Sequence, residues 1–272
     1  MIPSRVSNLL TYAQTHGVRA AGVRLTRGFR TGPDPDSTTE TASVFDSDWD
    51  VAIVLHGCRV DDLHAVTDDY WFLPPTDSTV APGDPPVDWI DSIVRGSPPG
   101  STLGYVTAVP SEPLVSPEHI GSLVEVESGD GSETTSIPPE TVSDRAIQMW
   151  CKDDVTKMIV HYQQPCPPFR NLDIHRSGPP SELFDRVRDG HLDAEVAREA
   201  YRGSIRWVLD DIESFIENVD APNIVLTSDH GVAFGDDGYW GATPDSIESV
   251  RRVPWVVTSG EDNKTRIPGE SQ

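Results

Sequence analysis

Residues 224–244 read IVLTSDHGVAFGDDGYWGATP. The apolar run IVLT stops at Ser228-Asp229-His230-Gly231, and a glycine-rich acidic loop follows it. A carboxylate and an imidazole at the end of a buried strand cost free energy unless they bind a partner. Asp229 and His230 are therefore candidate ligands of a bound group, and other parts of the chain must supply the remaining ligands.

Apolar runs similar to IVLT recur along the chain and alternate with segments of helical periodicity. Continuous apolar runs suit strands that are covered on both faces, and strand–helix alternation favours a parallel sheet. The sequence therefore predicts an α/β protein, a three-layer α/β/α sandwich with a mostly parallel sheet. Strands are expected at 51–55, 103–109, 157–162, 223–227 and 254–258, and helices at 86–96, 143–153 and 193–219.

Two of the expected helices carry specific signals. The helix at 143–153 begins at Ser143, a residue type that commonly caps helix N-termini. The helix at 193–219 is the longest, and its apolar residues, Val196 among them, recur every three or four positions. This spacing places one apolar stripe against a core.

The segments between these elements are rich in Pro, Asp, Ser and Thr, which is typical of loops. They are 31–43, 73–86 and 127–140. Since no internal repeat and no clear boundary divides the chain, we expect one domain over residues 1–272. Residues 1–47 are expected to be peripheral, with a short amphipathic helix near Leu9, and residues 259–272 to form a frayed tail.

The composition is strongly acidic, with 44 Asp and Glu against 21 Lys and Arg and a net charge of −23. A disordered chain of this charge would lack the apolar runs, so the excess carboxylates are expected on the surface of a folded protein. Such a surface repels itself unless salt screens it. This pattern predicts a halophilic, high-salt cytoplasm, and an ordinary acidic protein is the alternative.

The same charge argues against several partners and locations. Nucleic acids and anionic membranes both require basic patches. No stretch approaches the roughly 20 apolar residues of a membrane span, and the N-terminus lacks the apolar core of a signal peptide. The cysteines, Cys58, Cys151 and Cys166, are too few and too scattered for a disulfide framework, so reduced thiols are expected.

Polar residues follow two of the expected strands at the point where each strand ends. His56 follows strand 51–55, and Asp229 and His230 follow strand 223–227. Ligands collect at the carboxyl ends of parallel strands, so we expect these three side chains at one sheet edge. Imidazole and carboxylate are ligands of zinc, manganese and iron. Each residue taken alone is equally well explained as a satisfied polar group at a strand end.

Four stretches of the chain resemble a known family. The segment TSDHGVAFGDDGYWG, followed by VPWVV, resembles the Asp-His-Gly region of sulfatase-like proteins of the alkaline phosphatase superfamily, most of all their halophilic-archaeal branch. VAIVLHGCRVDDL, GYVTAVP and MIVHYQQPCPPF resemble other stretches of that branch in the same order. The resemblance covers roughly residues 48–258 and implies an alkaline-phosphatase-like fold.

The resemblance implies a centre of one or two metal ions, at which a Ser, Thr or modified Cys attacks phosphorus or sulfur. Asp229 and His230 match the paired metal ligands of the family. His56 stands where the family has a metal-binding Asp, Cys166 where it has a substrate-facing His, and Ala242 where it has a further His. The family's metal centre is therefore altered in this chain.

The nucleophile of the family is expected within residues 78–89, STVAPGDPPVDW, where proline and glycine crowd the expected place. Ser78 and Thr79 lie further upstream and are weak nucleophile candidates. Arg59 and Asp62, by contrast, match residues that follow the family's first strand. The resemblance thus implies retained scaffold residues around a substituted centre.

Two functions from different classes fit this sequence. The first is a metal-dependent hydrolase or transferase of phosphate or sulfate esters whose altered site is weakened or inactive, with Cys166 and Arg59 as candidate catalytic residues. A rearranged site for zinc or manganese is possible, because His56 and Cys166 can ligate a soft ion although Ala242 cannot. The second is a non-catalytic binding or assembly protein on a degenerate sulfatase-like scaffold.

In either case the expected partner is a small phosphate or sulfate ester. The aromatic residues Trp71, Tyr239 and Trp240 are candidates for the lining of a ligand groove, and partial burial in loops is the alternative. The sequence leaves the oligomeric state open.

The acidic surface makes stability depend on salt. Without screening, the 23 excess negative charges repel one another in the folded state. The melting temperature is therefore expected to rise as KCl is raised from roughly 0.1 to 3 M. Thermal melts followed by circular dichroism test this, and a melting temperature that is constant over the range would contradict the halophilic interpretation.

Overall fold

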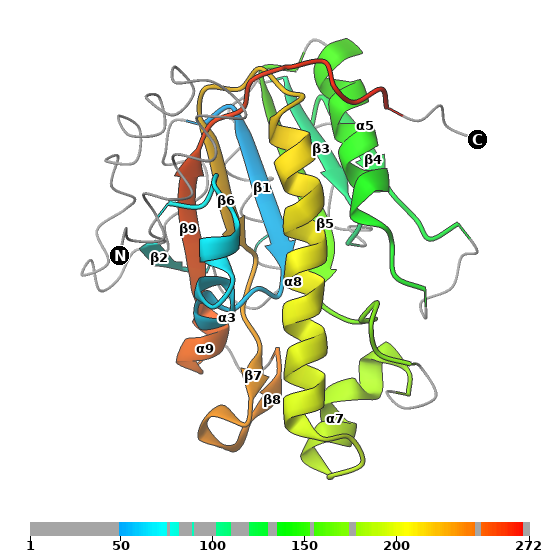
Figure 1. Cartoon of the computed structure of the whole chain (residues 1–272), viewed down its shortest axis with the longest axis vertical. Coiled ribbons are helices and arrows are strands. Elements are labelled where there is room, and N and C mark those ends of the chain that lie inside the picture. Colours follow the sequence, from blue (N-terminus) through cyan, green and yellow to red (C-terminus); the bar gives the residue numbers. More distant parts are fainter. Residues whose placement is uncertain are drawn as a thin grey trace, which may run out of the picture.

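The computed structural model describes residues 49–74, 77–81, 89, 102–109, 120–129, 135–152, 155–173, 178–242 and 246–268 (Figure 1). The short helix expected near Leu9, the loop at 31–43 and the helix at 86–96, apart from Trp89, lie outside these residues.

A mixed sheet forms the centre of the fold. In the part of the chain that the structure describes, it has seven strands in the order β2-β9-β6-β1-β5-β3-β4. The five strands from β6 to β4 run parallel, whereas β9 is antiparallel to β6 and β2 is antiparallel to β9. The expectation of a mostly parallel sheet is confirmed. The strands are β1 (Val51–His56), β2 (Asp77–Val80), β3 (Leu103–Thr107), β4 (Ser122–Glu125), β5 (Lys157–Pro165), β6 (Ile224–Ser228) and β9 (Arg252–Thr258).

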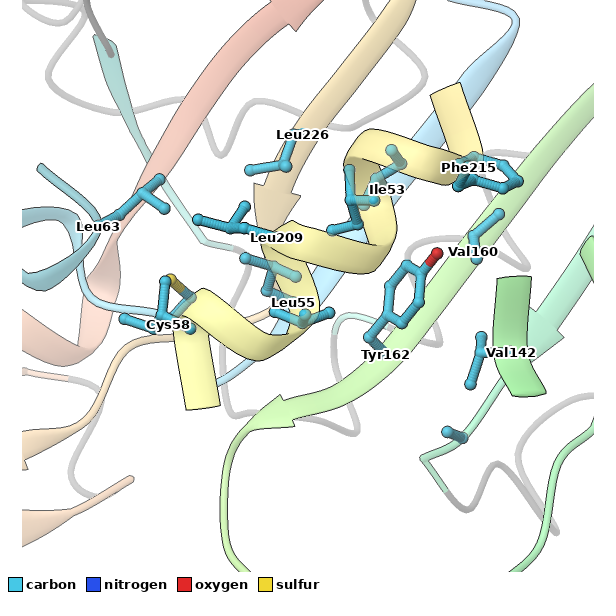
Figure 2. Packing of buried hydrophobic residues seen from close by; sticks show 14 of the residues in the cluster. Ile53, Leu55, Cys58, Leu63, Val142, Val160, Tyr162, Leu209, Phe215 and Leu226 are labelled. Atoms are coloured by element: carbon cyan, nitrogen blue, oxygen red, sulfur yellow. The ribbon is translucent and has the colours of Figure 1, made fainter. Parts of the chain in front are cut away.

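Both faces of the central strands are buried, which explains their continuous apolar runs. In β1, Ile53 and Leu55 pack under α8 (Ala194–Ile216), next to Leu209 and Phe215 (Figure 2). Helix α5 (Pro139–Lys152) lies beside α8 over the same face of the sheet (Figure 1). Val54, the residue between them, points to the opposite face of the sheet. Burial of each large apolar side chain contributes roughly 1.5–3 kcal/mol to the free energy of folding.

An aromatic-rich cluster covers the opposite face of the sheet. Trp49, Trp89, Tyr105 and Trp255 are all buried there together with Val54. Trp89 and Tyr105 of this cluster matter for the site, because both contact His161 of β5.

Helix α8 begins where the sequence predicts. The carboxylate of Asp193 accepts hydrogen bonds from the backbone N–H groups of Glu195 and Val196, 3.0 and 3.1 Å away, and so caps the helix. Most of the predicted stripe is buried, but Val196 is 38% exposed, so its assignment to the core is wrong. The first turn of α8 lies near α7 (Leu183–Arg188), at the end of the sheet rather than over it (Figure 1).

Helix α5 corrects another prediction, because it starts at Pro139 rather than at Ser143. Proline suits the first turn of a helix, where its missing N–H is not needed. Ser143 is fully buried inside the helix and hydrogen bonds the hydroxyl of Tyr162 and the carboxylate of Asp211. The Ser143 hydroxyl therefore does not cap the helix but links α5 to β5 and α8.

Several short elements replace expected loops. Strand β2 lies inside the predicted loop 73–86, and residues 135–140 of the predicted loop 127–140 contact β5 and begin α5. The remaining short elements are α3 (Val60–His64), η2 (Thr67–Asp69), η3 (Pro180–Glu182), β7 (Ala233–Phe234), η4 (Asp236–Gly238), β8 (Trp240–Gly241) and α9 (Glu248–Arg251). Within the described residues, no helix is both long enough and apolar enough to cross a membrane.

The tail is docked where the sequence predicts fraying. The backbone N–H groups of Gly260, Glu261 and Asn263 donate to carbonyls at or just after the C-terminal end of α8. The side-chain oxygen of Asn218 accepts from the backbone N–H groups of Thr265 and Arg266. The tail thus satisfies carbonyls that the end of a helix leaves without partners.

Arg266 fixes this tail to the helices. Its guanidinium contacts carboxylate oxygens of Asp144 and Asp211, each at 2.8 Å, and donates to the carbonyl of Glu140 at 2.7 Å. The Arg266 side chain is only 13% exposed, so solvent screens these ion pairs incompletely.

Replacing Arg266 therefore has a measurable cost. Arg266→Ala is expected to lower the free energy of unfolding by about 2 kcal/mol, because it leaves Asp211 without its charged partner. Arg188→Ala is the matched control, since Arg188 pairs with Asp185 and Asp189 at the exposed surface and should change stability little. Chemical denaturation at high salt measures both variants, and equal losses would contradict a docked tail.

Candidate metal centre

Three neighbouring strands bring the site residues together. Strand β1 lies between β5 and β6 and is parallel to both. In this register Leu55 lies opposite Ser228, and Val54 lies opposite His161. The residues that end β1 and β6 therefore meet at one edge of the sheet, as expected from their positions after parallel strands.

Asp229 lies at the centre of the site and is fully buried. Its Oδ1 accepts hydrogen bonds from the backbone N–H groups of Gly57 and His230, at 2.9 and 2.8 Å. Its Oδ2 lies 2.6 Å from Nδ1 of His56 and 3.3 Å from Nε2 of His161. Two strands and the turn after β6 are thereby joined through one carboxylate.

The charges at Asp229 and His56 are coupled. Burial alone would raise the pKa of the Asp229 carboxyl, but the neighbouring His230 and His56 hold that pKa well below its usual value. Burial opposes protonation of His56, yet Asp229 and Cys166 together hold its pKa well above its ordinary value. Both shifts favour the charged forms of these two side chains.

His230 presents one ring nitrogen to the site. Its Nδ1 lies 2.8 Å from the carbonyl oxygen of Gly231, so Nδ1 carries the proton and Nε2 keeps a lone pair. Burial lowers the pKa of this imidazole, which favours the neutral form that binds metals. The rings of His230 and His56 lie close, with centroids 4.9 Å apart.

His161 is a site residue that the sequence analysis missed. Its Nδ1 lies 3.0 Å from the hydroxyl of Tyr105, and its ring packs against Trp89, with centroids 5.5 Å apart. The ring is fully buried, and although its Nε2 is 3.3 Å from Asp229, the two atoms are not aligned for a hydrogen bond. A histidine inside an apolar strand run needs a buried partner, and this was the available signal.

Cys166 completes the cluster from the end of β5. Its backbone N–H donates to the carbonyl of His56 at 3.1 Å. Two overlapping groups of donor atoms share His56: one with Cys166 and His230, the other with His161 and Asp229. Within each group all donor atoms lie within 4.8 Å of one another, close to the spacing of roughly 3.5 Å on a tetrahedral zinc ion.

Two positions at the site require glycine because a Cβ there would overlap neighbouring atoms. Gly57 has a φ of +72°, and a Cβ there would lie 2.5 Å from Sγ of Cys166 and 3.2 Å from Cε1 of His230. Its missing side chain therefore leaves the space between two donor groups free. A Cβ on Gly231 would lie 2.0 Å from the backbone oxygen of Ser249 in α9, so the turn after Asp229 needs glycine to pack there.

The guanidinium of Arg59 is already bonded to other residues and is not free to bind a ligand at the donor cluster. It forms paired contacts with the carboxylates of Asp61 and Asp236 and donates to the carbonyl of Val232. The fully buried Asp62 contacts Arg59, Arg198 and Arg202. These ion pairs join α3 to α8 and to the loop that carries η4.

The other sequence-predicted site residues lie elsewhere. Ser78 and Thr79 are on β2, two strands away from β6 in the sheet, and the hydroxyl of Ser78 accepts from Arg252 at 3.0 Å. The expected nucleophile position, between Ala81 and Trp89, is outside the described residues. Ala242 follows β8 and is half-buried.

Of the three candidate groove aromatics, Trp71 and Trp240 pack partly buried against the main core, and Tyr239 is 46% exposed. These contacts support partial burial for the two tryptophans.

Gly231 provides a direct test of how tightly the Asp-His-Gly turn is built. Gly231→Ala is expected to lower the free energy of unfolding by about 3 kcal/mol, because Cβ would overlap a backbone atom that cannot rotate away. Gly129→Ala is the control, since nothing lies within 4 Å of a Cβ at that position. Denaturation midpoints at high salt measure both, and a neutral Gly231→Ala would refute this packing.

The fold is similar to those of several solved structures. The soluble domain of lipooligosaccharide phosphoethanolamine transferase A from Neisseria meningitidis has a TM-score of 0.52 and 14% identity, covering 79% of this chain and 77% of that one. The C-terminal periplasmic domain of EcEptC from Escherichia coli, in complex with Zn, has a TM-score of 0.48 and 12% identity over 81% and 76%. Phosphonate monoester hydrolase of Agrobacterium radiobacter has a TM-score of 0.48 and 13% identity over 78% and 68%.

No family model matches the sequence, and no curated protein matches it. At 14% identity, the similarity to the Neisseria meningitidis domain bears on the fold alone. Together with the mostly parallel seven-stranded sheet, it shows that the described residues have the alkaline-phosphatase-like α/β fold that the sequence predicts.

Proposed function

We propose that this protein binds a divalent metal ion and a small phosphate or sulfate ester, and that it hydrolyses or transfers the ester weakly. The observation that supports this most is the convergence of imidazole, thiol and carboxylate donors at the carboxyl edge of the sheet. Ligands of α/β proteins bind at this edge. The fold shared with a phosphoethanolamine transferase agrees with an ester as the ligand.

The donor set fits a borderline-soft ion such as zinc. His56, His161 and His230 offer ring nitrogens, Cys166 a sulfur and Asp229 a carboxylate. Sulfur and nitrogen donors select zinc over magnesium or calcium. When bound, such an ion would polarise an ester oxygen and stabilise negative charge as the ester bond breaks.

The chain's own residues supply binding and orientation, but the serine hydroxyl next to Asp229 in the chain is not free to act as a nucleophile. The hydroxyl of Ser228 contacts the carbonyls of Leu55 and His230 and accepts from the N–H of Cys58. Its hydrogen-bonding capacity is therefore in use. The guanidinium of Arg59 is likewise paired with the carboxylates of Asp61 and Asp236. Because these groups already have partners, we expect slow hydrolysis or transfer of the ester.

A non-catalytic binding protein is the second candidate. The hydrogen bonds of the Ser228 hydroxyl and the ion pairs of Arg59 favour it as well. A site that holds an ion and an anionic ester can serve recognition without turnover. The two candidates differ in one measurable quantity, which is the metal-dependent release of product.

Activity measurements distinguish these possibilities. Metal-loaded protein in high salt is expected to hydrolyse aryl phosphate and aryl sulfate esters slowly or not at all. Each well-placed electrostatic partner that is missing typically costs a hundredfold to a thousandfold in rate. Turnover is measured with and without added zinc or manganese, and any activity should disappear in Asp229→Ala.

Three outcomes are informative. Rapid metal-dependent turnover that Asp229→Ala abolishes would refute a weakened site. Binding of the ion and of an ester analogue without turnover would favour the binding protein. Turnover that persists unchanged in Asp229→Ala would refute a catalytic role for this site.

A further inference from the structure

The two donor groups that share His56 are alternatives for one ion, and their hydrogen bonds decide between them. Building on the proposed metal binding, we infer that the ion lies among His56, Cys166 and His230, while Asp229 and His161 position these ligands without binding the ion. The site is then a thiolate-containing zinc centre with three protein ligands and one open position.

The first argument is that hydrogen bonds occupy both oxygens of Asp229. Oδ1 accepts from two backbone N–H groups, those of Gly57 and His230. Oδ2 is 2.6 Å from Nδ1 of His56, which is a hydrogen-bond distance. Two ligand atoms of one ion lie about 3 Å apart or more, so these two atoms are bonded to each other rather than to a common ion.

The second argument concerns the free nitrogens of the two ligand histidines. Since Nδ1 of His56 donates to Asp229, its Nε2 remains to bind the ion. Since Nδ1 of His230 donates to the carbonyl of Gly231, its Nε2 also remains. Metal-binding histidines commonly donate their other nitrogen to a carboxylate or a backbone carbonyl, and both arrangements occur here.

His161 is excluded as a ligand by its neighbours. Its Nε2 lies 3.3 Å from Oδ2 of Asp229, and a carboxylate at that distance repels a lone pair but attracts an N–H, so Nε2 carries the proton. Its Nδ1 then accepts from the hydroxyl of Tyr105, 3.0 Å away. Tyr105 and His161 therefore form a chain of contacts that supports Asp229 from behind.

Cys166 supplies the charge that a buried divalent ion requires. The thiolate of Cys166 and the adjacent carboxylate of Asp229 together balance two positive charges. Gly57 leaves the space between Cys166 and His230 free of a Cβ. Two nitrogens and one sulfur select zinc or cobalt over manganese and magnesium.

The open fourth position fits an anionic ester oxygen or a water molecule. Catalytic zinc sites typically have three protein ligands and one such position, whereas structural sites have four. The side chain of His56 is 20% exposed, whereas those of Asp229 and His161 are fully buried. Access from solvent is therefore on the side of His56, and the positioning residues are behind it.

Cobalt substitution tests this assignment with a readout independent of activity. Metal-stripped protein in high salt is titrated with Co²⁺, and the absorbance is followed for the near-ultraviolet thiolate-to-cobalt charge-transfer band and for visible bands of four-coordinate cobalt. The wild type is expected to show both. Cys166→Ser should lose the charge-transfer band and bind Co²⁺ and Zn²⁺ roughly a hundredfold more weakly.

Three further variants separate ligands from positioning residues. Asp229→Asn should retain the charge-transfer band with roughly 10- to 100-fold weaker binding, as expected for a residue that orients a ligand. His161→Gln should retain the band and lose less affinity than Cys166→Ser. Cys151→Ser, at an exposed thiol on α5, is the matched control and should behave as wild type. Circular dichroism at high salt verifies that each variant is folded.

The outcomes separate this inference from the proposed function. If wild type binds cobalt without a charge-transfer band, or if His161→Gln abolishes binding while Cys166→Ser does not, the ion lies in the other donor group. The inference is then wrong and the proposed metal binding stands. If the wild type binds neither Co²⁺ nor Zn²⁺, both are wrong.

Discussion

The buried carboxylate of Asp229 is the interaction on which the rest of the site depends. It accepts hydrogen bonds from the backbone after β1 and after β6, and its other oxygen contacts His56 and His161. An unpaired carboxylate in this position would cost several kcal/mol. The parallel pairing of β1 with β5 and β6 is what brings these four partners to one point.

The surroundings of the site hold this carboxylate in place from two sides. Behind it, Trp89 and Tyr105 pack around His161 and exclude water from the sheet face opposite α8. Beyond the turn, Gly231 lets the chain pack against α9, with its N–H donating to the carbonyl of Val250 at 2.7 Å. Exclusion of water strengthens each polar contact inside.

The donor atoms and the ion pairs near the site both favour metal binding over stabilisation of a transferred anion. The donors near His56 are nitrogen and sulfur, and the arginine nearest in sequence, Arg59, is bound by carboxylates. Metal binding therefore has its donors in place, whereas the described residues offer few groups for stabilising a transferred anion.

The sequence by itself determined the local features of this protein. The apolar runs predicted the strands 51–55, 157–162 and 223–227, the apolar stripe predicted α8, and the strand ends pointed to His56, Asp229 and His230. Only the tertiary structure decided the role of His161, whose partners Tyr105 and Asp229 are each more than fifty residues away. The docking of the tail and strand β2 were also decided by the tertiary structure, because the tail bonds to the end of α8, to residues that follow it and to α5, and β2 bonds to β9. Periodicity reports which residues are buried, but it does not report which distant polar groups meet.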